Sequence, residues 1–400
     1  MHRWHRWYIF ASLASLYFWV YFHRVAPAVV ALDLMEEFEA SSAILGLMSA
    51  AYFYTYAIVQ IPIGVLSDSL GTRKTVTLFS LIAFIGTILF AFASDIQILT
   101  LGRALIGFGV GGVFIPTLKV IAEWFLPSDF ATLNGLLVAV GNLGGLVASA
   151  PLAILVLAFG WRSSFAVIAS ITLILTSIAW LVVRDSPFDY SFAPQRFEVK
   201  HAILTIFKKR EFWLLAIVAF LSYGTLMSFQ GLWGGPFLIE SYKFDKATAG
   251  GILMFTAIGV IIGCPLGGVL DRYLAKRPIF IFGVLLYTIA WLPLAFTQNS
   301  LSLSTLSLIC FTLGLAFGIS FIMLAIAKEM FPKQIAGTAL GSLNIFFFLG
   351  AACFQSSLGY LFHDYATMFK FCLGSMILAL LAAVFVRGGV KGEGKKFMMI

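Results

Sequence analysis

One arginine lies deep in a long apolar stretch, among residues suited to a small-anion site. Arg24 lies just past the middle of the stretch 7–33. Tyr17, Tyr21 and Ala28 recur with it at helical spacing and place a polar, aromatic stripe on one face. A guanidinium offers paired N–H donors that match the oxygens of a carboxylate or a phosphate. The spacing therefore predicts that Arg24 binds an anionic group.

Other polar side chains near the middle of apolar stretches could reach the same site. The substrate-binding residues that we predict are Arg24, Tyr17, Tyr21, Tyr52, Tyr56, Asn142, Tyr223, Gln230 and Asn344. Buried amides also hydrogen-bond between helices, so a purely structural role stays open for the residues other than Arg24. For Arg24 the alternative is a structural arginine satisfied by backbone carbonyls.

Two ionisable residues, His23 and Lys119, have more than one interpretation. His23 is the mid-span side chain that ordinarily titrates near neutral pH, so it is the candidate proton carrier; a neutral, hydrogen-bonded histidine is the alternative. Asp33 and Glu240, at the outer ends of their stretches, are other candidates. Lys119 has an acidic residue, Glu123, four positions on, so it is either a second substrate contact or half of an intrahelical ion pair.

The composition is that of a polytopic membrane protein. The 400 residues are 61% apolar and 11% charged, whereas soluble domains are about 45–50% apolar and about 25% charged. This excludes disordered chains, secreted disulfide scaffolds, nucleic-acid-binding domains and soluble enzymes. Four cysteines (Cys264, Cys310, Cys353 and Cys372) lie in apolar runs without metal-ligand spacing. We find no catalytic constellation, and expect no metal and no cofactor.

Twelve apolar runs are long enough for transmembrane helices. They lie near 7–33, 41–66, 75–93, 96–126, 130–157, 162–183, 211–240, 247–270, 278–297, 301–326, 335–360 and 366–386. The one long polar connection divides them into an N-terminal bundle (1–183), a linker (184–210) and a C-terminal bundle (211–400). This predicts an all-α membrane protein with two six-helix bundles.

The basic residues set the expected orientation. Of 26 Lys and Arg, nineteen fall on the side of the two termini and four on the other side. Cytoplasmic loops accumulate such residues, so both termini are expected in the cytoplasm. Arg24, Arg103 and Lys119 remain within the spans.

The two halves resemble each other in sequence. At an offset of 206 residues Gly112, Glu123 and Gly135 fall on Gly318, Glu329 and Gly341, and at an offset of 203 Gly64 and Asp68 fall on Gly267 and Asp271. Duplicated units of this kind place a substrate site between the halves, near the midplane of the membrane.

A glycine- and charge-rich turn stands between the second and third runs. It reads Gly64-Val65-Leu66-Ser67-Asp68-Ser69-Leu70-Gly71-Thr72-Arg73-Lys74. It resembles the G-x-L-a-D-r-x-G-r-[KR] signature of the major facilitator superfamily, with Ser69 in place of the usual arginine. A degenerate copy follows at 267–277, and Arg103-x-x-x-Gly107-x-Gly109 is similar to the family's motif in helix 4.

The resemblance covers essentially the whole chain and implies the fold of that family, two six-helix bundles related by a pseudo-two-fold axis. It also implies a charge network that latches the cytoplasmic ends of the bundles when the cavity opens outward. The latch residues would be Gly64, Asp68, Gly71, Arg73, Lys74, Arg103, Glu123, Asp271 and Arg272. A passive interfacial ion cluster is the alternative.

One further resemblance bears on the substrate. Tyr21-Phe22-His23-Arg24 resembles the Tyr-x-x-Arg of organic-anion members such as the organophosphate–phosphate antiporters, which place a second base on helix 7. Here the offset of 206 puts Gln230 opposite Arg24, and a neutral amide cannot neutralise a second charge. A monoanion, either a carboxylate or a zwitterion, therefore suits the site better than a phosphate ester.

We therefore expect a monomeric transporter of the cell inner membrane that moves a small organic anion or zwitterion by alternating access, in the direction of uptake. Proton coupling, facilitated diffusion and exchange stay open. The alternative in the same class is a proton-driven exporter of drugs or lipid-like molecules. Helix 5 speaks against it, because drug antiporters of the family carry Gly-Pro before Gly-Gly, whereas here the glycines of 141–145 precede Pro151. A non-transporting receptor or membrane enzyme is the alternative in a different class.

Overall fold

The computed structural model describes residues 4–60, 62–126, 129–185, 204–297, 300–361 and 364–386. Ten helices in this part of the chain are long and apolar enough to cross a membrane. A bent pair adds an eleventh: α1 (His5–Val25) and α2 (Pro27–Glu37) meet at 49°.

The N-terminal half continues with α3 (Ser42–Val59), α4 (Ile63–Leu70), α5 (Thr72–Ala91), α6 (Ile96–Val110), α7 (Phe114–Trp124), α8 (Phe130–Val147) and α9 (Ala150–Val182). The C-terminal half comprises α11 (Arg210–Ser228), the π-helix η1 (Phe229–Trp233), α12 (Gly234–Tyr242), α13 (Lys246–Leu270), α14 (Lys276–Phe296), α15 (Leu303–Ser320), α16 (Met323–Glu329), α17 (Lys333–Leu361) and α18 (Tyr365–Phe385). The predicted linker 184–210 lies mostly outside the described residues.

The structure divides the chain differently at the fifth and sixth predicted runs. Helix α8 ends at Val147, inside the run 130–157, and α9 begins at Ala150. Pro151 explains the break, since proline lacks an N–H and its ring clashes with a preceding carbonyl. Helix α9 then passes through Gly160, whose φ of 75° and ψ of 161° are not helical. That backbone is open almost only to glycine, and it lies where the sequence predicts the end of one span and the start of the next.

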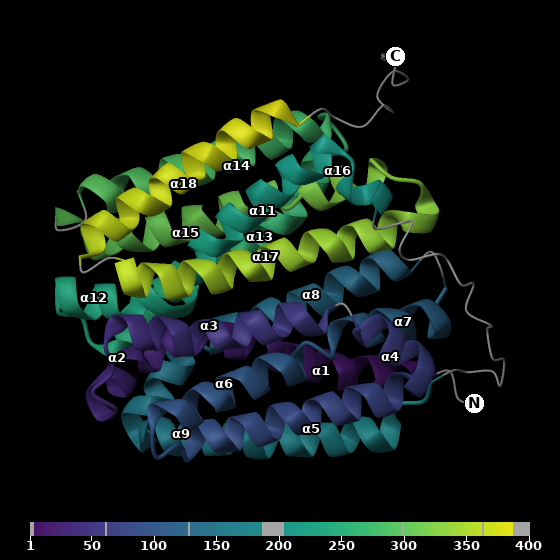
Figure 1. The fold of residues 1–400 in the computed structure, drawn as a ribbon, viewed down its shortest axis with the longest axis horizontal. Coiled ribbons are helices and arrows are strands. Elements are labelled where there is room, and N and C mark those ends of the chain that lie inside the picture. The colour runs from purple at the N-terminus through teal and green to yellow at the C-terminus, as the bar shows by residue number, and fades with distance from the viewer. Residues whose placement is uncertain are drawn as a thin grey trace.

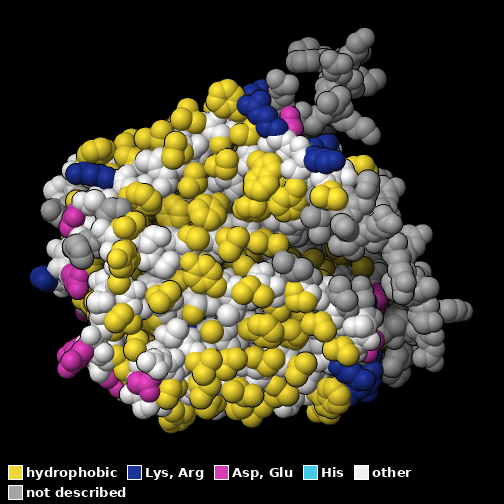
Figure 2. Space-filling model, viewed as in Figure 1, with side chains coloured by type: hydrophobic (Ala, Val, Ile, Leu, Met, Phe, Trp, Pro, Cys, Tyr) yellow, Lys and Arg dark blue, Asp and Glu magenta, His cyan; other side chains and the backbone are white. Residues whose placement is uncertain are grey.

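The two halves lie side by side with their helices running in roughly the same direction (Figure 1). Helix α1 begins and α18 ends at the same end of the molecule, which we call the terminal face. Helices α2 and α12 lie at the opposite end, which we call the far face. Apolar side chains cover the middle of the surface in view, and charged side chains gather towards the two ends (Figure 2). This is the distribution that a membrane demands, because charge is costly in the hydrocarbon layer.

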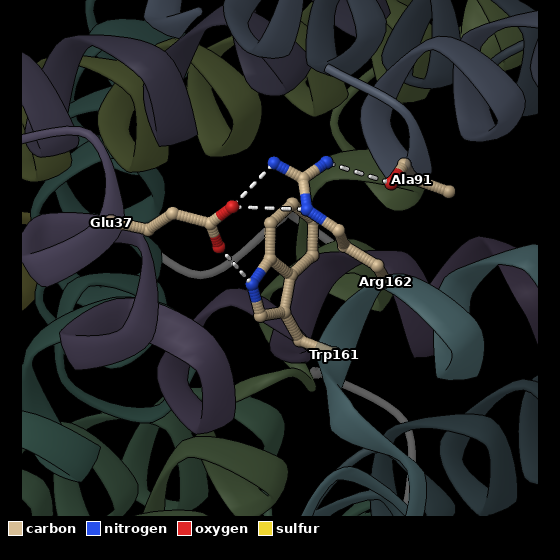
Figure 3. Close-up of polar contacts among 4 residues, drawn as sticks. All are labelled: Glu37, Ala91, Trp161 and Arg162. Carbon is tan, nitrogen blue, oxygen red and sulfur yellow. Dashed lines mark hydrogen bonds and ion pairs between the residues drawn. The ribbon is translucent and has the colours of Figure 1, made fainter. Parts of the chain in front are cut away.

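The far face of the N-terminal half is fastened by a polar cluster around Glu37 (Figure 3). The Nε1 of Trp161 donates to Glu37 Oε2 over 2.7 Å, and the Nε of Arg162 donates to Oε1 over 3.0 Å. Arg162 also donates through Nη1 to the carbonyl of Ala91, over 3.1 Å. Because these residues follow Gly160 directly, the cluster joins the ends of α2 and α5 to the second part of α9.

The two halves also meet closely at the far face. A Cβ placed on Gly235 in α12 would lie 1.9 Å from the backbone oxygen of Ala28 in α2. A Cβ on Gly359 in α17 would lie 2.3 Å from the backbone oxygen of Ser42. Lys246 at the start of α13 forms an ion pair with Asp33 in α2. These contacts close the far face between the halves.

Candidate functional site

Two helix breaks face each other at the centre of the molecule. Helix α1 ends at Val25 because Pro27 begins a new helix, and proline at the first helical position is favoured there. Opposite, α11 widens into the π-helix η1, a form that is common at functional sites. A Cβ on Gly231 in η1 would lie 2.8 Å from the backbone oxygen of Arg24. The two breaks therefore touch, and they bring Arg24 and Gln230 to the same level.

A cavity lies beside these breaks, with a volume of about 590 Å³ that includes space open to solvent. Its N-terminal lining comes from α1 (Tyr21, Arg24 and Val25) and α8 (Val138, Asn142 and Gly145). Its C-terminal lining comes from Tyr223, Leu226, Met227, Gln230, Ala257, Val260, Cys264, Phe317 and Phe321.

Arg24 is the charged residue of this lining, and it is 4% exposed. Its Nη1 lies 3.5 Å from the hydroxyl of Tyr223, a long hydrogen bond across the two halves. Its Nε has no hydrogen-bond partner among the described residues. None of the described lining residues is acidic. The guanidinium therefore has donor capacity that a bound anion could use.

Aromatic rings surround the guanidinium. Its central carbon lies 4.3 Å from the ring centroid of Tyr21, 4.9 Å from that of Phe348 and 5.0 Å from that of Tyr56. Such contacts stabilise a cation through the ring faces and leave it without an opposing charge. Phe348 comes from α17, so both halves hold the arginine in place.

Arg103 is the second buried arginine among the described residues, and it lies outside the cavity lining. Arg103 is fully buried, and its Nη1 donates to the backbone oxygen of His23 over 2.8 Å. It also lies 4.8 Å from the ring centroid of Tyr52. The ring of His23 packs against Trp19, Phe22 and Phe165, outside the cavity lining. The role of His23 as a proton carrier stays a prediction, without a place for it in the lining.

Of the predicted binding residues, Arg24, Tyr21, Asn142, Tyr223 and Gln230 line the cavity. Tyr56 packs on the Arg24 guanidinium but is not part of the lining. The Tyr52 hydroxyl donates to the backbone oxygen of Val20 over 2.9 Å. Tyr17 stacks on Phe114, and Asn344 is half-buried outside the lining. Two residues near the site are not among the predicted ones. Phe348 packs on Arg24, and Gln355 is fully buried and donates to the backbone oxygen of Met227 over 2.9 Å.

The predicted latch is partly described in the N-terminal half. Gly71 adopts a φ of 81°, which fits a turn that only glycine makes easily. Arg73 donates through Nε to the backbone oxygen of Trp180 over 2.7 Å and stacks on its ring, and its backbone N–H donates to Asp185 Oδ1 over 2.8 Å. The side chain of Asp68 lies outside the described residues.

Three further latch residues, Gly64, Lys74 and Glu123, lie near the ends of α4, α5 and α7, and Lys119 lies in the middle of α7. Lys119 donates to the backbone oxygen of Ser67 over 3.1 Å. Gly64 is half-buried, and Lys74 and Glu123 are exposed. Lys119 is not part of the cavity lining, and both of its predicted roles, a substrate contact and half of an ion pair, stay predictions.

The second copy of the turn forms an ion cluster with Glu329 at the end of α16. Lys276 Nζ lies 3.0 Å from Asp271 Oδ1 and 3.1 Å from Glu329 Oε1, while Arg272 is exposed. At the repeat offsets Lys276 corresponds to Arg73, and Glu329 corresponds to Glu123. Arg73 and Lys276 thus each contact residues of their own half, and the latch role of these groups stays a prediction.

Comparison with known proteins agrees with this architecture. A probable sulfoacetate transporter of Cupriavidus necator is 28% identical over 88% of this chain and 86% of its own length. A probable galactarate/D-glucarate transporter of Escherichia coli is 23% identical over 93% and 92%. A solved bacterial homologue of the human lysosomal transporter Spinster, in an inward-facing and occupied conformation, has a TM-score of 0.77 with 20% identity and covers 96% of this chain and 97% of its own.

The family profile described as Major Facilitator Superfamily matches residues 9–355. It includes the turn at 64–74, the second copy at 267–277 and nearly all of the cavity-forming helices. The chain is therefore a transporter that belongs to the major facilitator superfamily.

Proposed function

We propose that this transporter takes up a small organic anion of the carboxylate type, which Arg24 binds between the two halves. One observation supports the proposal most strongly. Arg24 is buried, lines the cavity and has no acidic residue beside it among the described lining residues. A buried charge without a partner is costly. A carboxylate would supply the missing charge and accept the donors that the protein leaves unused.

The relatives support the same substrate class. The names of the proteins from Cupriavidus necator and Escherichia coli assign them organic acids, sulfoacetate and the sugar diacids galactarate and D-glucarate. Gln230 stands opposite Arg24 in the cavity, and a neutral amide can hydrogen-bond a substrate without balancing a second charge. We therefore favour a substrate that presents one anionic group to Arg24.

The direction of transport rests on the orientation expected from the basic residues. With the terminal face in the cytoplasm, the far face, where the two halves are in contact, would point outward. Rocking of the halves about Arg24 would then open the far face and load the substrate from outside.

A thermal-unfolding screen of the purified protein tests the substrate class. A ligand that binds the folded state raises its stability by mass action. We expect small monocarboxylates to raise the melting temperature in proportion to the logarithm of their concentration. Neutral amides of the same acids should leave it unchanged, because they cannot pair with Arg24.

Two variants make the screen specific. In Arg24→Gln the carboxylate-induced shift should vanish. In Arg103→Gln, which removes the buried arginine outside the lining, the melting temperature should fall while the shift remains. A shift that persists in Arg24→Gln, or that neutral amides produce equally, would rule out the proposed anion site.

A further inference from the structure

The helices that line the cavity differ in the polarity of the side chains they contribute. Its hydrogen-bonding groups gather around Arg24, with Tyr21 on the same helix and Tyr223 and Gln230 from the opposite half. Asn142 also belongs to the lining, and one N–H of its Nδ2 donates to the backbone oxygen of Val138 over 2.9 Å, which leaves the second N–H and Oδ1 for a substrate. The polar groups of the lining therefore come from α1, α8, α11 and η1.

Helices α13 and α15 contribute an almost entirely apolar part of the lining, which we call the α13–α15 wall. Ala257, Val260 and Cys264 recur at helical spacing and lie on one face of α13. Phe317 and Phe321 stand four residues apart at the end of α15, and their ring centroids are 5.8 Å apart. These five side chains offer a substrate apolar contact and, apart from the weakly polar thiol, no hydrogen-bonding group.

The polar and apolar parts of the lining are close together. The ring of Tyr223 lies 5.9 Å from the ring of Phe317, centroid to centroid, while its hydroxyl lies 3.5 Å from Arg24. One tyrosine side chain thus spans the distance between the charged end and the aromatic wall. A compact molecule with a carboxylate at one end would reach both.

We propose that the substrate is a compact monocarboxylate with an apolar body, either a hydrocarbon ring or a branched chain, rather than a polyhydroxylated sugar acid. This rests on the proposed function, because it assumes that Arg24 holds the carboxylate. Hydroxyl groups placed against Val260 and Phe317 would lose their hydrogen bonds to water without gaining others, which disfavours sugar acids. The apolar body would instead be removed from water by the α13–α15 wall.

The test compares two six-membered-ring acids of equal charge, cyclohexanecarboxylate and glucuronate, by equilibrium binding to the purified protein. We expect cyclohexanecarboxylate to bind at least about tenfold more tightly, a difference of about 1.4 kcal/mol. Cyclohexanemethanol serves as the neutral control and should not bind. Val260→Thr, a change of nearly constant volume, should weaken binding of cyclohexanecarboxylate, whereas Val284→Thr, in the buried part of α14 away from the cavity, should not.

Each outcome decides a different part of the account. If glucuronate binds as tightly as cyclohexanecarboxylate or more tightly, the apolar body is wrong and the anion site at Arg24 stands. If neither acid binds, the proposed substrate class is wrong. If cyclohexanemethanol binds as tightly as its acid, or if Arg24→Gln leaves binding of the acid unchanged, the proposed function itself fails.

Discussion

Replacement of Arg24 by glutamine is expected to lower uptake of the substrate into proteoliposomes by between about thirtyfold and a few thousandfold at limiting concentration. Removal of one partner of a buried, hydrogen-bonded charge pair costs about 2–5 kcal/mol, and each 1.4 kcal/mol is about tenfold in affinity. The cost should be near the upper end of this range, because Arg24 is 4% exposed and is the charged residue of the lining.

Arg24→Lys separates charge from geometry. Lysine keeps the positive charge but lacks the planar fork that binds a carboxylate through two parallel hydrogen bonds. It also stacks less well on Tyr21 and Phe348, which now lie 4.3 and 4.9 Å from the guanidinium carbon. We expect uptake by Arg24→Lys to lie between those of the wild type and Arg24→Gln, with most of the loss in the Michaelis constant. Wild-type uptake in both variants would exclude Arg24 from substrate binding.

The second large effect is expected from Gly235→Ala. A Cβ at this position would lie 1.9 Å from the backbone oxygen of Ala28, in the other half of the molecule. Backbone cannot retreat as a flexible side chain can, so α12 and α2 must move apart. The closed far face would become unfavourable, and alternating access needs both closures in turn.

We expect uptake by Gly235→Ala to fall at least about tenfold, the change that 1.4 kcal/mol of bias against closure produces. The carboxylate-induced rise in melting temperature should remain, because Arg24 is unchanged. Gly374→Ala is the matched control, since a Cβ there meets nothing within 4 Å. Uptake by Gly235→Ala at the wild-type rate would show that this contact does not limit the transport cycle.

The sequence predicts most of the helices and the buried position of Arg24, because both depend on local properties. Apolar length identifies the spans, and the depth of Arg24 in its stretch makes it a candidate for binding without knowledge of its neighbours. The repeat offset adds Gln230, which lines the cavity opposite Arg24. Asn142 and Tyr223 are predicted because their polar side chains lie near the middle of apolar stretches, and both line the cavity.

The remaining side chains depend on packing that periodicity does not encode. Tyr17 shares the helical face of Arg24, yet its ring stacks on Phe114 instead of entering the cavity. Three consecutive phenylalanines show the same limit, because adjacent residues point in different directions around a helix. Phe346 packs on Phe212, Phe347 on Tyr223, and Phe348 on Arg24. No period in the sequence distinguishes the third of them.

Local backbone changes are similarly hidden. The π-helix at 229–233, which contains Gln230, alters the helical register. The backbone N–H of Arg73 donates to Asp185, which is 112 residues away in the sequence. Such features arise from contacts between distant segments. Only the structure reveals them.

The most direct test of the anion site is an experimental structure of the protein with a carboxylate from the thermal-unfolding screen bound. We expect the carboxylate oxygens to lie within hydrogen-bonding distance of the Arg24 guanidinium, between α1 and η1. The remainder of the ligand should lie towards Val260 and Phe317. A ligand bound elsewhere, or bound in this cavity with its carboxylate turned away from Arg24, would contradict the account.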